Sequence, residues 1–367
     1  CDIGCNDGAK NSLDHTYLSA AAHHGARLRT GCEVRAVRPD DGGGYLTEYL
    51  RHPLDPAGRS AAGPGGGRPR AGTVHSDRLI LAAGTFGTTQ LLLRCRRWLP
   101  GLGPALGTRY CGNGDLLGFA VRAGGGSRVL APSRGPVITG AIRLPDEADG
   151  VGGAAQGGYV QDGGYPGFVD WLVEGLDAPQ HAARIARLLL RRRVAAGVRS
   201  DQAAQLSAVV ADLIGAGGLS SSSMPLLGMG RDTPDGVLRL RHGQLDAEWT
   251  PQTSAVLLDR LRSTMRGVAG TLGARFVENP LWQGRRSVTV HPSGGAPMGG
   301  HPGVGVCDGY GAVFGHPGMY IVDGSALPGP VGANPALTVA ALADRGWERV
   351  RGSEPATSEL QPRNLAQ

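Results

Sequence analysis

Two short apolar runs, each ending near a glycine and each followed by a helix pattern, restrict the fold of this chain more than any other feature. The first run covers residues 78–84, and its helix is expected over residues 85–94. The second covers residues 319–325, and its helix is expected over residues 336–350. A short continuous apolar run is typical of a strand buried on both faces. The repeated pattern predicts an α/β fold in which ligands bind where strands give way to helices.

The start of the second helix carries two further signals. Asn334 is a good N-cap residue, and Pro335 occupies the first helical position, which proline favours. The helix is apolar on most sides from Leu337 to Leu342, which predicts that it is buried. Its N-terminus follows a glycine loop and would offer free N–H groups and the positive helix dipole to an electron-rich ligand. Simple capping by Asn334 is the alternative.

Composition and periodicity divide the chain into three regions and a tail. Residues 1–120 alternate helix and strand, residues 121–285 are more irregular, residues 286–352 contain the second strand and helix, and residues 353–367 form a polar tail expected to fray. Further helices are expected over residues 12–25, 178–194 and 202–214, further strands over residues 28–37, 237–240 and 287–290, and a glycine-rich hairpin or loop over residues 40–72.

The near absence of lysine excludes one large class of nucleotide-binding proteins. Only Lys10 is present, and Asn11 follows it, whereas a phosphate-binding P-loop needs Gly-Lys-Ser/Thr. The glycines at residues 215–218 imitate a dinucleotide fingerprint, but the serine run at residues 220–223 favours a loop over the helix that the fingerprint needs. Scattered arginines, 5% aromatic residues and the lack of a recognition motif predict no nucleic-acid partner.

Six cysteines are too few to staple 367 residues, so free thiols are expected. The spacing of Cys1, Cys5 and His15 is not a zinc pattern, and no metal site is expected. No apolar run reaches the roughly 18 residues of a membrane span. The arginines within residues 184–193 favour a solvated helix face, with transient contact to an anionic membrane surface as the alternative.

The chain begins at Cys1 inside a dense polar motif, with no methionine and no signal peptide. This start predicts a truncated N-terminus. Localisation, cytoplasmic or secreted, therefore stays open.

His291 is the strongest candidate for a catalytic base. It follows the strand expected over residues 287–290 and precedes Gly294 and Gly295. Histidine titrates near neutral pH, and the end of a strand beside a flexible glycine pair is a good location for a general base. An ordinary surface or core histidine is the alternative on local grounds.

Five motifs occur in order along the chain: residues 1–14, Leu81 to Thr89, Gly112-Asn113-Gly114, His291 to Gly295, and Val322-Asp323-Gly324-Ser325 followed by Asn334-Pro335. Together they resemble the flavin-dependent glucose-methanol-choline (GMC) oxidoreductases, specifically the cholesterol oxidase-like branch. The resemblance covers nearly the whole chain and is best at residues 1–120 and 286–350.

The resemblance implies that FAD lies on a Rossmann-like domain, part of it in residues 1–120 and part in residues 286–352, and that an antiparallel sheet in residues 121–285 covers the substrate. It assigns Val34 to the adenine side of FAD, Gly84 to the neighbourhood of the cofactor, Asp323, Gly324, Pro335 and Ala336 to the ribityl and flavin-ring end, and His291 and Asn334 to the substrate hydroxyl group.

The implied reaction is FAD-dependent oxidation of a secondary alcohol, foremost a 3-hydroxysteroid such as cholesterol. His291 and Asn334 are the polar pair expected to hold the hydroxyl oxygen while the hydride leaves the carbon. Oxygen as electron acceptor makes the protein an oxidase, and another acceptor makes it a dehydrogenase. The alternatives are another bulky alcohol as substrate, or an inactive truncated remnant.

The sequence departs from the family pattern in two places. The N-terminal glycine fingerprint and the acidic residue that binds the FAD ribose are absent, since they belong upstream of Cys1. The glutamate that isomerises the steroid double bond also lacks a match, because residues 220–229 hold no carboxylate and residues 159–166 offer only Gln161 and Asp162. Isomerase activity is therefore expected to be weak or missing unless Asp162 substitutes.

Overall fold

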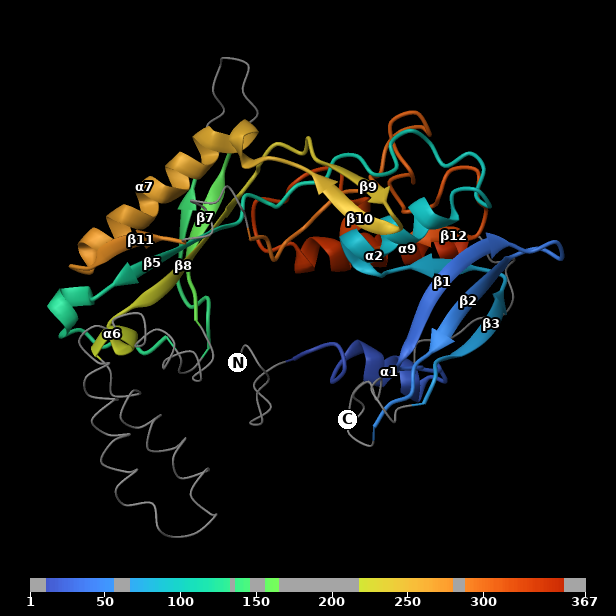
Figure 1. The fold of residues 1–367 in the computed structure, drawn as a ribbon, viewed down its shortest axis with the longest axis horizontal. Helices are drawn as coiled ribbons and strands as arrows, with labels where there is room; N and C mark the ends of the chain where they lie inside the picture. The colour runs from blue at the N-terminus through green and yellow to red at the C-terminus, as the bar shows by residue number, and fades with distance from the viewer. Residues whose placement is uncertain are drawn as a thin grey trace, which may run out of the picture. The chain divides into compact units, whose positions relative to one another are not determined.

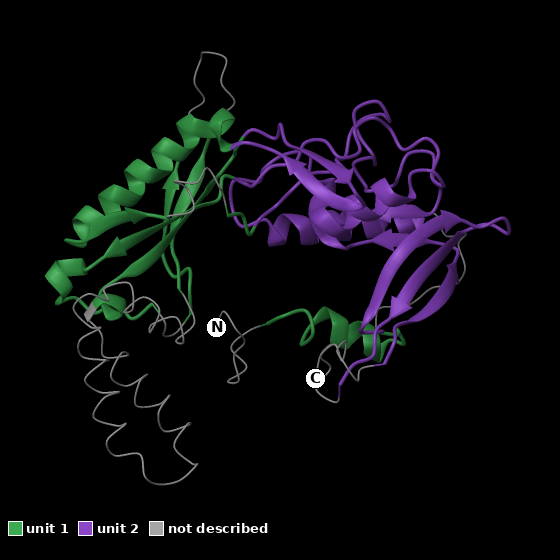
Figure 2. Cartoon of the chain, viewed as in Figure 1, with its two compact units in different colours: residues 1–28, 114–232, 251–290 green, residues 29–113, 233–250, 291–367 purple. Residues whose placement is uncertain are grey.

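The computed structural model describes residues 11–55, 67–132, 136–145, 156–164, 218–279 and 288–352 (Figure 1). Several segments with sequence expectations lie outside the described residues: the opening residues 1–10, the two helices expected over residues 178–194 and 202–214, and the tail 353–367. The chain forms two compact units (Figure 2): unit 1 comprises residues 1–28, 114–232 and 251–290, and unit 2 comprises residues 29–113, 233–250 and 291–367.

Unit 1 contains a five-stranded antiparallel sheet with the strand order β11-β5-β8-β7-β6. Its elements are α1 (Tyr17–His23), β5 (Leu116–Val121), η1 (Ala123–Gly126), β6 (Ala141–Leu144), β7 (Gly158–Asp162), α6 (Gly218–Ser221), β8 (Met224–Gly230), η3 (Pro251–Ser254), α7 (Ala255–Thr271) and β11 (Arg275–Glu278). Helix α7 lies along one face of this sheet (Figure 1).

The core of unit 1 lies between α7 and that face of the sheet. Leu257, Leu261 and Met265 recur at four-residue spacing on α7 and are fully buried, as a helix with one apolar face requires. A Cβ at Gly228 of β8 would lie 2.9 Å from the terminal methyl carbon of Met265, so only glycine lets the helix approach this closely. Each buried leucine of this kind contributes about 1.5–3 kcal/mol to folding.

Unit 2 is built from three small sheets and two long helices. Its elements are β1 (Cys32–Pro39), β2 (Tyr45–Arg51), β3 (Arg70–Ser76), β4 (Leu79–Leu81), α2 (Gly84–Cys95), β9 (Val237–Arg241), β10 (Gln244–Glu248), β12 (Met319–Ile321), η4 (Gly324–Ala326) and α9 (Ala336–Gly352). Strands β1, β2 and β3 form an antiparallel sheet, β9 and β10 form a hairpin, and β4 and β12 pair in parallel.

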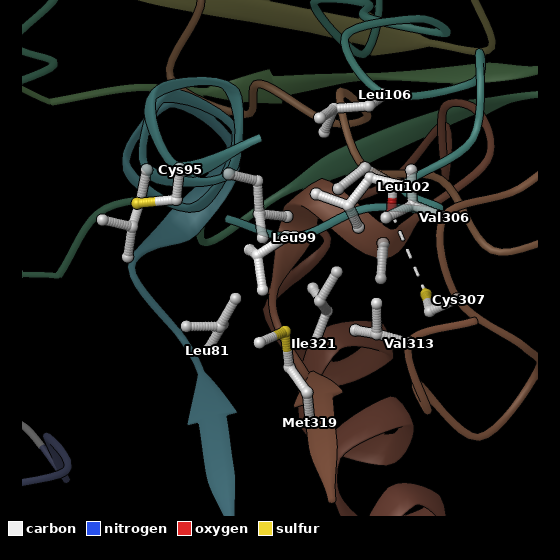
Figure 3. Packing of buried hydrophobic residues seen from close by; sticks show 14 of the residues in the cluster. Leu81, Cys95, Leu99, Leu102, Leu106, Val306, Cys307, Val313, Met319 and Ile321 are labelled. Carbon is white, nitrogen blue, oxygen red and sulfur yellow. Dashed lines mark hydrogen bonds between the residues drawn. The ribbon is translucent and has the colours of Figure 1, made fainter. Parts of the chain in front are cut away.

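The core of unit 2 forms around the parallel pair β4 and β12. Figure 3 shows Leu81 of β4 with Met319 and Ile321 of β12 among the buried side chains. The two β12 residues are fully buried, and Leu99, which follows α2, packs in the same cluster. Residues 78–84 and 319–325 therefore each contain a strand, as expected, but burial on both faces is found only for β12, because Ile80 of β4 is 48% exposed.

The thiols of Cys32, Cys95, Cys111 and Cys307 are free, as the low cysteine count predicts for the described residues. Burial raises the pKa of Cys307 to about 12, because a thiolate loses its hydration in the core. Cys307 is therefore a structural thiol, and its Sγ lies 3.9 Å from the Ala296 carbonyl oxygen (Figure 3).

Several sequence expectations agree with the structure. Helix α2 matches the expectation over residues 85–94, β9 matches the strand at residues 237–240, and β2 with β3 forms a hairpin within residues 40–76. The first helix, expected over residues 12–25, is shorter and spans Tyr17–His23. Within the described residues, no helix is long and apolar enough to cross a bilayer.

Three expectations are wrong. Residues 288–290 do not form a strand, because the Val290 amide donates at 2.7 Å to the Asp115 carboxylate instead of to a neighbouring strand. The glycine group before the serine run ends in a single helical turn, α6, where a loop was expected. Helix α9 is not buried all round, and Leu337 is 80% exposed.

The error at α9 has a physical reason. Its buried positions are Leu342, Gly346 and Val350, which recur every four residues and form one stripe. The alanines that made the helix look apolar on most sides are small and tolerate exposure, so they do not define a buried face.

Candidate functional site

The parallel pairing of β4 and β12 brings two turns together at one edge of the pair. Leu81 pairs with Ile321, and the Val322 amide donates to the Leu81 carbonyl at 3.0 Å. Parallel strands end at the same edge, so Gly84 at the start of α2 meets Asp323 across a sequence separation of 239 residues. The two regions that the sequence singled out separately therefore form one site in unit 2.

Asp323 is the centre of this site. Its side chain is 5% exposed, and each carboxylate oxygen accepts two hydrogen bonds. Oδ2 accepts from the Gly84 amide at 3.0 Å and from Thr88 Oγ1 at 2.5 Å, while Oδ1 accepts from the Ser325 amide at 2.8 Å and from Ser325 Oγ at 2.5 Å. Four donors match the four acceptor sites of a carboxylate, so the side chain ties α2 firmly to η4.

Thr88 extends this cluster to the turn before α2. Its hydroxyl oxygen accepts from the Ala83 amide at 3.1 Å while its proton goes to Asp323. Both amides of the Ala83–Gly84 turn are thus directed into the protein. The carboxylate also lies against the N-terminal end of α2, where it accepts from the Gly84 amide.

The loop that carries His291 is held by the same two elements. Thr85 Oγ1 of α2 donates to the Pro292 carbonyl at 2.7 Å, and the Gly294 amide donates to the Gly324 carbonyl of η4 at 3.0 Å. A reciprocal pair of backbone hydrogen bonds, both 3.1 Å, joins Ser293 to Cys111. His291 is partly buried at the start of this fixed loop.

Two glycines are required in that loop. Gly294 and Gly295 have positive φ angles of 85° and 100°. A Cβ at Gly294 would fall on the Arg109 carbonyl, and one at Gly295 would fall on the Thr89 hydroxyl. The His-Pro-Ser-Gly-Gly sequence therefore gives the chain a close backbone approach that larger residues forbid.

Asn113 fixes the segment that leads to Asn334 and Pro335. Its side chain is fully buried, its Nδ2 donates to the Ala333 carbonyl at 3.0 Å, and its Oδ1 accepts from the Gly332 amide at 2.8 Å. Helix α9 then begins, with the Val339 amide donating to the Pro335 carbonyl at 2.9 Å. Because Asn113 lies two residues after Cys111, the α9 start and the His291 loop are anchored to one short segment.

The residues at the turn before α2 are small, and the space in front of Gly84 is open. Ala82 and Ala83 are exposed, Gly84 has a φ of 75°, and a Cβ added to Gly84 would meet no atom within 4 Å. Phe86, in the first turn of α2, is 42% exposed. Small residues with open space in front let a flat ligand lie directly on the backbone.

The structure brings together three of the predicted site residues and the loop that follows His291. Gly84, Asp323 and Gly324 share one hydrogen-bonded cluster with the loop that follows His291, and the segment held by Asn113 leads into Asn334, Pro335 and Ala336. Val34 does not take part in these hydrogen bonds, and its side chain is 42% exposed on β1.

Sequence reasoning missed the side chains that assemble the site. Thr85, Thr88 and Ser325 received no role, and Asn113 was noted only as part of a loop motif. The available signal was the placement of Thr85 and Thr88 in the first helical turns after Gly84, where hydroxyl groups often bond to backbone or to a neighbouring carboxylate.

Asp162 of unit 1 is the carboxylate that the sequence offered in place of the isomerising glutamate. The Asp162 carboxylate accepts from the Gly140 amide at 2.5 Å and from Thr139 Oγ1 at 2.9 Å. Burial opposes ionisation there, but these hydrogen bonds outweigh it and lower the pKa of Asp162. Gln161 is buried on the other face of β7, where it pairs with Leu227 of β8. Asp162 therefore holds a turn.

Comparison with known proteins relates the chain to one family of enzymes. Residues 254–343 match the family model described as GMC oxidoreductase. The chain is 28% identical over 370 residues to a cholesterol oxidase of Mycobacterium tuberculosis, covering 94% of this chain and 57% of the relative. It is 24% identical over 368 residues to a cholesterol oxidase of Acinetobacter baumannii, covering 95% of this chain and 60% of the relative.

A solved structure shares the fold. An FAD-dependent oxidoreductase from Chaetomium thermophilum superposes with a TM-score of 0.50 at 14% identity, covering 93% of this chain and 64% of that one. The chain thus spans less than two thirds of the length of the relatives it matches. Residues 254–343 thus match the GMC oxidoreductase family model, and nearly the whole chain is similar in sequence to cholesterol oxidases.

Proposed function

We propose that this chain is the larger part of an FAD-dependent oxidoreductase that oxidises a bulky secondary alcohol, foremost a 3-hydroxysteroid such as cholesterol. One observation carries the proposal: the His291 loop, the Gly84 turn and the Asp323 turn, far apart in sequence, are joined by direct hydrogen bonds in unit 2. The similarity to cholesterol oxidases supports the substrate class. The electron acceptor is oxygen or another small oxidant.

The residues at the site fit FAD. Ala82 and Ala83 are exposed, and Gly84 has open space where a Cβ would stand, which suits a flat cofactor. Gly84, Gly324, Pro335 and Ala336 would line the cofactor, Asp323 would hold the turn beside it, and Val34 would lie at its adenine side. FAD, when bound, accepts the hydride that leaves the alcohol carbon.

The chain's own residues supply the acid–base part of the reaction. A ring nitrogen of His291 takes the hydroxyl proton, which makes departure of the hydride from the carbon easier. The amide of Asn334 donates a hydrogen bond to the same oxygen and holds the carbon in place. The positive end of the α9 dipole would stabilise negative charge that accumulates nearby during the reaction.

Residues 121–285 are the region proposed for substrate binding, and they contain most of the antiparallel sheet of unit 1. The carboxylate of Asp162 is occupied by the Thr139–Gly140 turn, and Gln161 is a poor proton acceptor. We therefore propose that the oxidised steroid leaves without migration of its double bond.

The test is an anaerobic titration followed by flavin absorbance. The protein, in a form extended upstream of Cys1, is mixed without oxygen with cholesterol, with a 5-saturated sterol and with a small secondary alcohol. Bleaching of the flavin band by both sterols supports the proposal. Bleaching by the small alcohol alone would show that the substrate is not a sterol. A colourless protein would contradict flavin chemistry.

Analysis of the product tests the isomerase prediction separately. Cholesterol oxidised by the protein should keep its double bond in the original place, so the strong ultraviolet band of a conjugated enone should not develop. Rapid formation of that band would show that another group moves the proton.

A further inference from the structure

We propose that Asp323 is a positioning residue for His291, which it holds through two hydrogen-bonded arms, one on each carboxylate oxygen. The inference rests on the proposed function for the role of His291. In this proposal the Asp323 side chain holds the site together, and the residues beside it contact the cofactor.

The first arm runs through α2. Asp323 Oδ2 accepts from the Gly84 amide and from Thr88 Oγ1, which fixes the first turn of the helix. Thr85 lies in that turn, is 4% exposed, and donates its hydroxyl proton to the Pro292 carbonyl at 2.7 Å. Pro292 directly follows His291, so a shift of α2 moves the histidine backbone.

The second arm runs through η4. Asp323 Oδ1 accepts from the amide and the hydroxyl group of Ser325, which closes the turn that contains Gly324. The Gly324 carbonyl accepts from the Gly294 amide, and the Ser325 carbonyl accepts from the Ala296 amide, both at 3.0 Å. The His291 loop is thus held at its start by α2 and further along by η4.

Only a carboxylate can serve both arms at once. All four groups that face Asp323 donate hydrogen bonds, and an ionised carboxylate is the side chain that accepts on every side without donating. Asparagine has the same shape but would turn its NH₂ group toward either the Gly84 pair or the Ser325 pair. The NH₂ group would then meet two donors of one arm, and the hydrogen bonds of that arm would be lost. In a buried site, such a loss is costly.

Four variants of the flavin-loaded protein separate positioning from general stability. Asp323→Asn disturbs one carboxylate oxygen, and Thr85→Val removes only the contact with Pro292. Thr85→Ser keeps the hydroxyl group and should restore wild-type behaviour. Thr89→Val is the matched control, since Thr89 is in the same helix, is equally buried, and its hydroxyl group has no partner within the described structure.

The first readout is the nitrogen NMR spectrum of histidine-labelled protein, with the His291 signal assigned by its loss in His291→Gln. Asp323→Asn and Thr85→Val should shift or broaden that signal, while Thr85→Ser and Thr89→Val leave it in place. This readout needs no turnover, so it tests the positioning even if no alcohol is oxidised.

The second readout is steady-state kinetics across pH. Misplacing the base should lower kcat about 10- to 100-fold with a smaller change in KM, because errors near 1 Å in a reacting group have effects of this order. The pH profile of kcat/KM should move in the same two variants. An unchanged His291 signal and pH profile in both, accompanied only by lower thermal stability, would overturn the proposal.

Discussion

Thr88 and Thr89 are neighbours in α2 with opposite hydrogen-bonding environments. Both side chains are fully buried, but Thr88 Oγ1 bridges the Ala83 amide and Asp323, whereas Thr89 Oγ1 has no partner among the described residues. Thr88→Val should lower the free energy of unfolding by about 1–3 kcal/mol, because it removes the acceptor of the Ala83 amide and one of the two donors to Asp323 Oδ2.

The matched substitution Thr89→Val should change that free energy little or raise it slightly, since it removes an unpaired hydroxyl group at nearly constant volume. Urea unfolding of the two variants measures the difference. Equal losses in both would show that the Thr88 bridge does not contribute.

His316 makes stability depend on pH. Burial lowers the pKa of His316 below its ordinary value of 6.5, since the charged ring would lose hydration, although a hydrogen bond to the Pro100 carbonyl partly opposes this. The unfolded chain then binds a proton more readily than the folded one as the pH falls below 6.5. Stability should therefore decrease from about pH 7 toward about pH 5, with the slope set by proton binding.

His316→Gln should flatten this slope in urea unfolding at several pH values. His242→Asn is the control, because His242 is exposed with a positive φ of 52°, which asparagine tolerates. A slope that persists in His316→Gln would assign the pH dependence to other groups.

At the scale of elements, a substitution in the turn from β4 into α2 should affect ligand binding more than the stability of the fold. Gly84→Ala forces alanine into a φ of 75° but meets no neighbouring atom, so only backbone strain of about 1–2 kcal/mol is expected. The added methyl group fills the open space proposed for FAD and should weaken flavin binding at least tenfold. Fluorescence titration with FAD and urea unfolding measure the two effects.

Gly294→Ala is the contrasting change. Its Cβ would fall on the Arg109 carbonyl, so this substitution should destabilise the fold itself more than Gly84→Ala does. If Gly84→Ala bound FAD as tightly as the wild type, the turn would not lie against the cofactor.

The elements that the sequence predicted best were those with strong local signals. The apolar runs at β4 and β12 and the helix after Gly84 agree with the structure because short apolar runs and helical spacing are local patterns. Residues 288–290 look like a strand locally, yet Asp115, far away in sequence, takes the Val290 amide. The one-sided burial of α9 likewise depends on packing that local apolarity does not reveal.

The candidate site shows the same division. Motif order marked His291, Gly84 and Asp323, but the contact between Gly84 and Asp323, 239 residues apart, depends on the parallel pairing of β4 with β12. The threonines and Asn113 that fix the loops could not be ranked from sequence, since a buried hydroxyl or amide is recognised only when its partner is known.

At the scale of the whole molecule, the chain has two compact units. Unit 2 contains His291, Asp323 and the Gly84 turn, and unit 1 contains an antiparallel sheet with α7 on one face. Both are present in a chain that covers 57% of the length of a similar cholesterol oxidase. The proposed activity therefore belongs to the complete protein.

The central claim is that His291 acts on the alcohol while the flavin receives the hydride. Single-turnover reduction of the bound flavin by a sterol, compared between the wild type and His291→Gln without oxygen, tests it most directly. The account predicts equal flavin content and reduction slowed about 10²- to 10⁴-fold in the variant, the usual contribution of a positioned base. Equal reduction rates in the two proteins would contradict it.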